Sequence, residues 1–293
     1  MASCRHAERT CGPRREPSSV SSLAELSSSR ELMLSLTRRE LRGKFKRSLL
    51  GWTWSLVNPL ATMLIFTLVF GFFLKMTTPA GEPSGLSNFP LFLLCGLLPW
   101  NFLANGINGS MGALLNNSNL IKKVYFPREV LVGAVVASAG VAFFIEMAVL
   151  AIALIIAGNF VIPWLIPAVG LTVIQAVFVL GVGLMLSVVN VYFRDLQHLV
   201  GIALQFWFYS TPIVYPLDVV PVRAEFLGVD VPVRMLYELN PMVRFVEAYR
   251  DCLYDLRFPP VSDVLYLIVC SAAMLAFGLY VFLRMEPKLA EEL

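Results

Sequence analysis

Long apolar runs, separated by short polar stretches, dominate the hydropathy pattern of this chain. A helix needs about 20 apolar residues to cross the hydrocarbon core of a bilayer. The stretch between Glu146 and Arg194 holds 47 uncharged residues, too many for one helix, and its middle, around Gly158 and Pro163, is typical of a turn. The pattern predicts an all-α integral membrane protein with six transmembrane helices, at Leu56–Leu74, Phe89–Gly109, Val130–Ala157, Trp164–Asn190, Leu196–Val214 and Val264–Leu283.

The composition agrees with a membrane protein. The chain is 57% hydrophobic and 15% charged, with a mean hydropathy of +0.72, whereas soluble domains carry about 25% charged residues. Its five cysteines include no CxxC pair, so neither a disulfide framework nor a zinc site is predicted. Cys4, His6 and Cys11 lie close together in the sequence, but the four-ligand spacing of a structural zinc site is absent.

Positive charge is concentrated at the N-terminal end. The first fifty residues hold eleven Lys/Arg against five acids, and the remainder holds twelve against fifteen. Basic arms also bind nucleic acid, but this one adjoins a tryptophan pair and an apolar run, which favours membrane lipids as its contact and no nucleic acid. With six helices both termini share the face that collects most Lys/Arg. The positive-inside rule therefore predicts a multi-pass protein of the cytoplasmic membrane with both termini in the cytoplasm.

The N-terminal region divides into a tail and a helix. Residues 1–28 are rich in Ser, Pro and Arg, show no cleavable signal peptide, and predict a disordered cytoplasmic tail. Residues 29–50 predict an amphipathic helix in the cytoplasmic interface, since Ser28 and Glu31 have capping-box spacing and apolar residues recur on one stripe. This helix is either a topology anchor or a gate on the route by which amphiphilic cargo enters. The gate candidates are Arg38, Arg39, Arg42, Lys44, Phe45, Lys46 and Arg47.

Residues 51–293 form the predicted transmembrane domain, and a short cytoplasmic helix is predicted within it at about 117–127. Asn117 and Ser118 are cap candidates for a helix of about two turns, and Pro127 ends it because proline disfavours helix in the preceding residue. Its apolar residues favour a docking helix for a cytoplasmic partner, although they would also suit burial in the membrane interface. The docking candidates are Leu120, Ile121, Lys122, Lys123, Val124, Tyr125 and Phe126.

The segment 215–260, between the fifth and sixth spans, holds a helix that is too short and too charged to cross the bilayer. Asn240 and Pro241 mark its start, with asparagine as the cap and proline at the first helical position. We expect this helix on the outer surface, either covering an exit as a re-entrant gate or as an element without a transport role. The outer-gate candidates are Asn240, Pro241, Arg244, Glu247, Tyr249 and Arg250.

Several residues of the spans are candidates for the transport path. Glu146 lies inside the third span, where a carboxylate is costly and by default marks function, unless it is neutral or lies near the outer interface. The aromatic residues predict interfacial belts first, and as flat apolar faces they are also candidates for lining a sugar channel. They are Trp52, Trp54, Trp100, Phe102, Phe206, Trp207 and Tyr209.

No motif for energy conversion or hydrolysis is visible. The sequence contains no GxxxxGK[ST], HExxH or GxSxG and has two histidines. We therefore expect a non-enzymatic transport subunit without a cofactor of its own. A secondary transporter would place several ionisable groups at the midplane, where only Glu146 fits. A membrane transferase would gather carboxylates at one interface, whereas the acids of 215–260 are scattered among arginines and predict solvated faces.

Four blocks of the sequence carry a family resemblance: RRELRGKFKRSLLGWTWSLVNPL, SNLIKKVYFPREVL, NVYFRDLQHLVGIALQFWFYSTPIVYP and LNPMVRFVEAYRDCLY. In their order and spacing the chain resembles the membrane subunits of ABC-2 type exporters for cell-surface polysaccharides, such as O-antigen, teichoic acid and capsule. The resemblance covers most of residues 30–290. It implies a homodimer of six-span subunits and two copies of a cytoplasmic ATPase, which binds ATP and magnesium and drives a polyprenyl-linked glycan outward.

The resemblance also implies roles by position. The basic helix is similar to a cytoplasmic gate helix, 117–127 to the coupling helix that docks the ATPase, and 240–256 to outer gate helices. The aromatic residues Trp52, Trp54, Trp100 and Phe102 are similar in position to sugar-contacting channel residues. The tail before residue 28 departs from the family pattern. The Arg-, Ala- and Val-rich composition favours an actinobacterial source with a cell-wall galactan as cargo. An ABC-2 exporter of drugs or small lipids is the alternative within the family.

Overall fold

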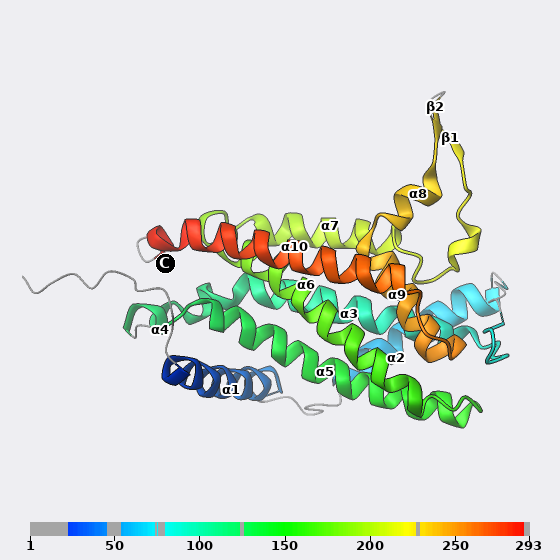
Figure 1. Cartoon of the computed structure of the whole chain (residues 1–293), viewed down its shortest axis with the longest axis horizontal. Coiled ribbons are helices and arrows are strands. Elements are labelled where there is room, and N and C mark those ends of the chain that lie inside the picture. Colours follow the sequence, from blue (N-terminus) through cyan, green and yellow to red (C-terminus); the bar gives the residue numbers. More distant parts are fainter. Residues whose placement is uncertain are drawn as a thin grey trace, which may run out of the picture.

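A computed structural model describes residues 23–45, 54–73, 75, 80–123, 126–226 and 229–289. These segments are mostly helical, and the long helices run side by side as a bundle (Figure 1). The prediction of an all-α membrane fold is confirmed, with one small addition. Strands β1 (Ala224–Phe226) and β2 (Val229–Val231) pair antiparallel in a hairpin. Each strand has three residues, which is too short for alternating hydropathy to predict it.

Four helices of the described chain are long and apolar enough to cross a membrane. They are α3 (Phe89–Ala113), α5 (Glu129–Ile156), α6 (Leu165–Tyr192) with the 3-10 turn η4 (Ile162–Trp164) before it, and α10 (Val261–Met285). At the first predicted span lies α2 (Trp54–Phe66), continued by the π-helix η2 (Thr67–Phe73). The six-span count stays a prediction.

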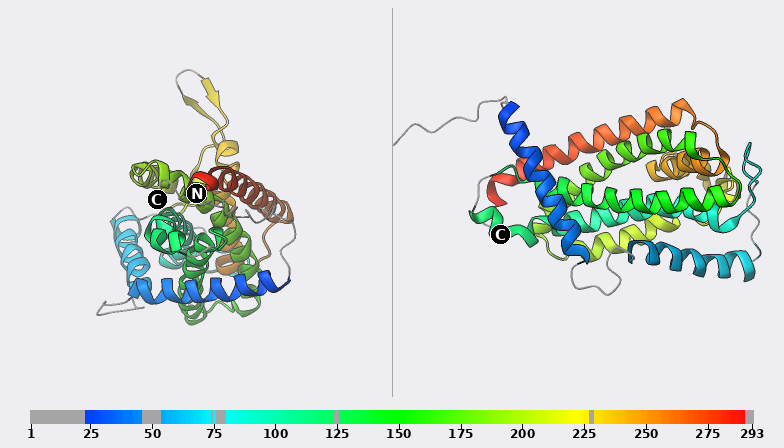
Figure 2. Two further views of the ribbon diagram at one scale, coloured as in Figure 1. Left: turned by 90° about the vertical axis from the view of Figure 1, so that its left-hand side faces the viewer. Right: turned by 90° about the horizontal axis from the view of Figure 1, so that it is seen from below.

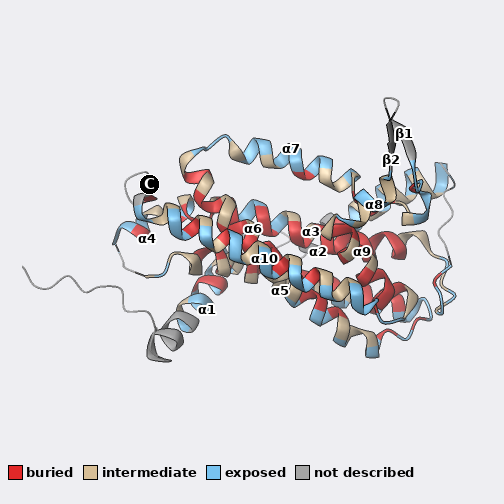
Figure 3. Cartoon of the chain, turned by 45° about the horizontal axis from the view of Figure 1, so that its top comes forward, coloured by how far each residue is buried: buried red, intermediate tan, exposed pale blue. Residues whose placement is uncertain are grey.

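The fifth predicted span is the one that differs most from the structure. Its helix, α7 (Leu196–Tyr209), has 14 residues, which is about 21 Å at 1.5 Å per residue. We predicted a span as far as Val214, but Pro212 disfavours helix in the residue before it, so the helix ends earlier. Figure 3 shows that α7 is exposed along most of its length, and Leu204 is its one buried residue.

Short elements complete the chain at the two ends of the bundle. At one end lie η3 (Leu115–Asn117), α4 (Ser118–Lys123) and η7 (Glu286–Lys288). At the other end lie η5 (Leu217–Val219), α8 (Val233–Glu238), α9 (Pro241–Arg250) and the π-helix η6 (Asp251–Asp255), together with the hairpin (Figure 1). The short elements that we predicted on opposite sides of the membrane thus lie at opposite ends of the molecule.

The helix α1 (Leu23–Phe45) lies across the bundle near the end that holds α4, and it packs against α5 (Figure 2). Among its residues 31–43, whose side chains the structure describes, Leu36 and Thr37 are buried. We predicted a helix start at Ser28, but helix is already present from Leu23, because Leu, Ala and Glu at 23–26 are strong helix formers. Residues 23–28 therefore do not belong to a disordered tail, and Lys46 and Arg47 lie outside the described residues.

The core is built around α3, which packs against α5, α6 and α9. Seventeen of its residues are buried, among them Leu93, Leu103 and Ile107. Helices α6 and α10 approach each other closely, because a methyl group on Gly181 would lie only 2.6 Å from the carbonyl oxygen of Met274. Large apolar side chains on the outer faces stay exposed, as expected where a bundle meets lipid; they include Phe72, Ile166, Ile202 and Phe277.

Candidate functional site

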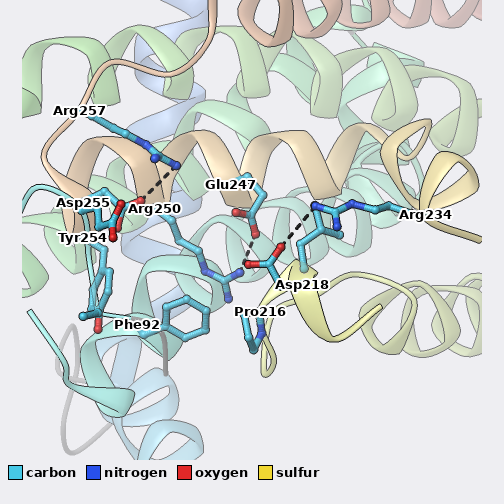
Figure 4. Close-up of a pocket in the computed structure, with 12 residues that line it drawn as sticks. Phe92, Pro216, Asp218, Arg234, Glu247, Arg250, Tyr254, Asp255 and Arg257 are labelled. Carbon is cyan, nitrogen blue, oxygen red and sulfur yellow. Dashed lines mark hydrogen bonds and ion pairs between the residues drawn. The ribbon is translucent and has the colours of Figure 1, made fainter. Parts of the chain in front are cut away.

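A polar cavity of about 450 Å³ lies at the end of the bundle opposite α4 (Figure 4). It is lined by the start of α3, by α8, α9 and η6, and by the segments around residues 80–82, 216–218 and 257. Cavities of this size hold small ligands in proteins. Its lining consists of Ala80, Glu82, Phe92, Pro216, Leu217, Asp218, Arg234, Glu247, Arg250, Tyr254, Asp255 and Arg257.

Arg250 is a buried lining residue of this cavity, and several contacts hold its side chain in place. Its side chain is 3% exposed; Nη1 donates to Oε1 of Glu247 at 2.8 Å and Nη2 donates to the carbonyl oxygen of Ile213 at 2.7 Å. The guanidinium carbon lies 3.8 Å from the centroid of the Phe92 ring, a cation–π contact. Glu247 and Arg250 are three residues apart and so share a helix face. Arg250 therefore joins α9, α3 and the segment after α7.

Arg257, another lining residue, pairs with Asp251 beside the cavity. Leu256 has a φ of 62° and turns the chain back, so that the backbone N–H of Arg257 donates to the carbonyl oxygen of Asp251 at 2.8 Å. The Nε of Arg257 donates to Oδ1 of Asp251 at 2.7 Å, and its Nη2 lies 3.3 Å from Oδ2 of Asp255. Burial raises the pKa of Asp251 to about 6, against the opposing effect of Arg257.

From their scatter among arginines we predicted that the acids of this region are solvated. This prediction is wrong for Asp251. Asp251 is buried, because η6 packs against α5 and α6 instead of facing water. Burial likewise raises the pKa of Asp255. No signal in the sequence separates Asp251 from the exposed Asp218, since burial here depends on helices that are distant along the chain.

The start of α9 is tied to α7. Asn240 is the N-cap residue, as the Asn-Pro pair predicts, and its Oδ1 accepts from the backbone N–H of Met242 at 3.0 Å. The same oxygen accepts from Nε1 of Trp207 on α7 at 2.8 Å. Among the other outer-gate candidates, Tyr249 is buried and shares a hydrogen bond with Thr172 of α6 at 3.0 Å, while Arg244 pairs with Asp263 of α10. Of these candidates, only Glu247 and Arg250 line the cavity.

At the opposite end, α4 presents two lysines. Lys122 and Lys123 are exposed, but Ile121 is buried in the chain's own cluster with Leu36 and Val188. Leu120 and Phe126 pack against the same cluster. Our prediction that Ile121 offers its side chain to a partner is therefore wrong, because the short helix folds back onto the bundle. The docking candidates Val124 and Tyr125 lie outside the described residues.

A hydrogen bond connects α1 to the segment before α4. Arg39 donates to Oδ1 of Asn117, and Nδ2 of Asn117 donates to the carbonyl oxygen of Ala113 at 2.8 Å. Arg38 and Arg42 are exposed. The gate candidates Lys44 and Phe45 have side chains outside the described residues.

The aromatic candidates separate into two groups. Trp100 and Phe102 are buried: Trp100 meets the ring of Trp207 edge-on at 5.9 Å, and Phe102 stacks on Phe143 at 5.2 Å. Phe206 and Tyr209 are 75% and 61% exposed on α7. Trp52 and the side chain of Trp54 lie outside the described residues. Within one chain the first group belongs to the core, and only the second lies on a surface.

Glu146 is buried between α2, α3 and α5, where it lines a cavity of about 50 Å³ with Pro59, Leu98 and Leu150. Its role stays a prediction. In the part of the chain that the structure describes, no group of three His, Cys, Asp or Glu side chains is placed to hold a metal ion.

Comparison with known proteins decides the family. Residues 31–254 match the family described as ABC-2 type transporter. The chain belongs to this family. The family resemblance drawn from the four sequence blocks is thereby confirmed, and so is a multi-pass membrane protein.

Relatives of this ABC-2 permease align along almost all of it. The O-antigen export system permease protein RfbA of Myxococcus xanthus is 32% identical over 92% of this chain and 98% of its own length. A protein of the same name from Klebsiella pneumoniae is 28% identical over 89% of this chain and 94% of its own length. The polysialic acid transport protein KpsM of Escherichia coli is 27% identical over 85% of this chain and 91% of its own length.

Proposed function

We propose that this chain is the membrane subunit of an ABC exporter that moves a lipid-linked polysaccharide across the cytoplasmic membrane. The observation that carries the proposal is the near full-length similarity to permeases named for O-antigen export and polysialic acid transport. Export permeases of the ABC-2 family work with an ATPase partner. We further propose that the permease is a homodimer, that two ATPase subunits supply ATP and magnesium, and that the chain itself catalyses no reaction.

The arrangement of the two ends supports this proposal. The exposed Lys122 and Lys123 lie at the end of the bundle that α1 crosses, which suits an ATPase on the cytoplasmic side. Positive side chains at the edge of a docking site would favour a partner with acidic groups. The short, charged elements α9 and η6 cover the opposite end, which suits an outer gate. Both termini would then be cytoplasmic.

Reconstitution tests the proposal. The permease is co-expressed with a candidate ABC ATPase subunit, purified and placed in lipid vesicles, and ATP turnover is measured with and without a polyprenyl-linked glycan. We expect the glycan to stimulate turnover, and an ATPase variant unable to hydrolyse ATP to abolish the signal. Stimulation by small drugs or simple lipids, with none by glycan, would replace the proposal by the other ABC-2 cargo class.

A further inference from the structure

The outer cavity differs from a phosphate site or a cation site in its charge balance. Its lining holds three arginines and four carboxylates: Arg234, Arg250, Arg257, Glu82, Asp218, Glu247 and Asp255. An anion site needs a surplus of positive charge, whereas this lining has more carboxylates than arginines. A cation site needs several oxygen ligands around one point, and the described residues form no such group.

Each arginine of the lining is already paired with a carboxylate. Arg250 lies 2.8 Å from Glu247, and Arg234 lies 3.3 Å from Asp218. Arg257 lies 3.3 Å from Asp255. Figure 4 shows these pairs arranged around the same space. A phosphate would have to displace a carboxylate partner, whereas an uncharged ligand need not.

Guanidinium–carboxylate pairs match vicinal hydroxyl groups. A guanidinium group only donates hydrogen bonds and a carboxylate only accepts them, whereas a hydroxyl group does both. Two neighbouring hydroxyls can therefore bridge one pair, the first accepting from the arginine and the second donating to the acid. Because Arg250 is held by Glu247, Ile213 and Phe92, part of the site is rigid before a ligand arrives, which lowers the entropy lost on binding.

We propose that this outer cavity is a binding site for uncharged sugar units and does not bind phosphate or acidic sugars. The inference rests on the proposed function only for the source of the sugar, which would be the exported glycan as it leaves the permease. Asp218 is the accessible acceptor of the site, since its side chain is 81% exposed and lies beside Arg234.

Saturation-transfer NMR on the purified full chain, in nanodiscs without a sugar-based detergent, tests this. The uncharged probes are the methyl glycosides of glucose, galactose and mannose. The anionic probes are glucuronate, galacturonate and methyl phosphate, each of which carries C–H protons that can report saturation transfer. We expect transfer to at least one uncharged probe and to none of the anions. Transfer to no uncharged probe, or tighter binding of an anion, would overturn the assignment.

A matched pair of variants locates the site. Asp218→Ala removes a charged acceptor at an exposed position. We expect it to weaken sugar binding about tenfold, because one charge-assisted hydrogen bond to the sugar is lost. Asp195→Ala is the control, because Asp195 is exposed, makes no capping hydrogen bond and lies in the turn between α6 and α7, away from the cavity. Equal affinities in the two variants would overturn the assignment. If the chain binds sugar but glycan does not stimulate ATP turnover, the sugar site is supported and only the proposed export function is rejected.

Discussion

Two glycines determine how closely α6 and α10 approach. A methyl group at Gly278 would collide with the backbone of Gly181, and one at Gly181 would lie 2.6 Å from the Met274 carbonyl oxygen. Backbone cannot move aside as a side-chain tip can, so Gly278→Ala should destabilise the fold by about 1–3 kcal/mol, the usual cost of overpacking. The melting temperature of the purified protein measures this.

Gly170 provides the control for that substitution. It lies on α6, and a methyl group there would meet nothing within 4 Å. Since alanine favours helix over glycine by about 1 kcal/mol, Gly170→Ala should keep or raise the melting temperature. Equal melting temperatures for the two variants would show that the α6–α10 contact does not limit stability.

Asp251 should make stability depend on pH. Burial raises its pKa from 3.8 to about 6, in spite of Arg257 and with Glu247 and Asp255 adding to the rise. The folded state then holds this proton more tightly than the unfolded state, so the contribution of Asp251 to stability falls as the pH rises from about 4 to about 6. Asp251→Asn cannot ionise, and its melting temperature should fall less over this range. Parallel profiles for the wild type and the variant would contradict the assignment.

Among elements, a side-chain hydrogen bond joins α1 to η3 at the α4 end of the bundle. Arg39 donates to Asn117 across the two elements. We expect Arg39→Ala and Asn117→Ala to be non-additive in the free energy of unfolding, with a coupling of about 1 kcal/mol. Arg38 is an exposed neighbour, so Arg38→Ala should be additive with Asn117→Ala. Additivity in both cycles would mean that the hydrogen bond contributes nothing to holding α1.

The lysines of α4 allow a test of partner docking. Lys122→Glu with Lys123→Glu reverses two exposed charges, and if an ATPase docks there its co-purification with the permease should drop by about tenfold or more, since each like-charge contact costs affinity. Lys75→Glu is the control, because Lys75 is exposed and follows η2 at the start of the loop before α3. Equal ATPase recovery with all three lysine substitutions would place the docking surface elsewhere.

Hydropathy predicted the elements whose length is set by the membrane. The predicted Val130–Ala157 differs from α5 by one residue at each end, because a change from apolar to polar residues marks both borders. The start of α1 was missed, since Leu23 and its neighbours carry helix propensity without an apolar run. The N-cap at Asn240 was found because an Asn-Pro pair is a local signal.

The outer cavity could not be predicted, because its lining comes from five separate regions of the sequence, around residues 80–82, 92, 216–218, 234 and 247–257. Phe92 on α3, Asp218 on η5 and Arg257 after η6 meet only through helix packing. The one sequence signal available was the spacing of Glu247 and Arg250, which placed them on one helix face. Hydropathy cannot show that Arg250 is buried, since an arginine counts as polar wherever it lies.

As a whole, the molecule has a chemically distinct group at each end of the bundle, and this asymmetry predicts its orientation. The α4 end exposes Lys122 and Lys123, whereas the cavity end pairs its arginines with acids. Because lysines and arginines in short loops are retained in the cytoplasm, the α4 end should face inward and the hairpin end outward.

Cysteine labelling of intact cells measures that orientation. With Cys4, Cys11 and the partly exposed Cys270 changed to Ser, the remaining Cys95 and Cys252 are buried. An introduced exposed cysteine should then dominate the reaction with a membrane-impermeant maleimide. Val222→Cys, at an exposed position before the hairpin, should react in intact cells. Asn119→Cys, exposed on α4, should react only after the membrane is opened. The reverse pattern would invert the molecule, put the sugar cavity in the cytoplasm and leave the lysines of α4 out of reach of any ATPase.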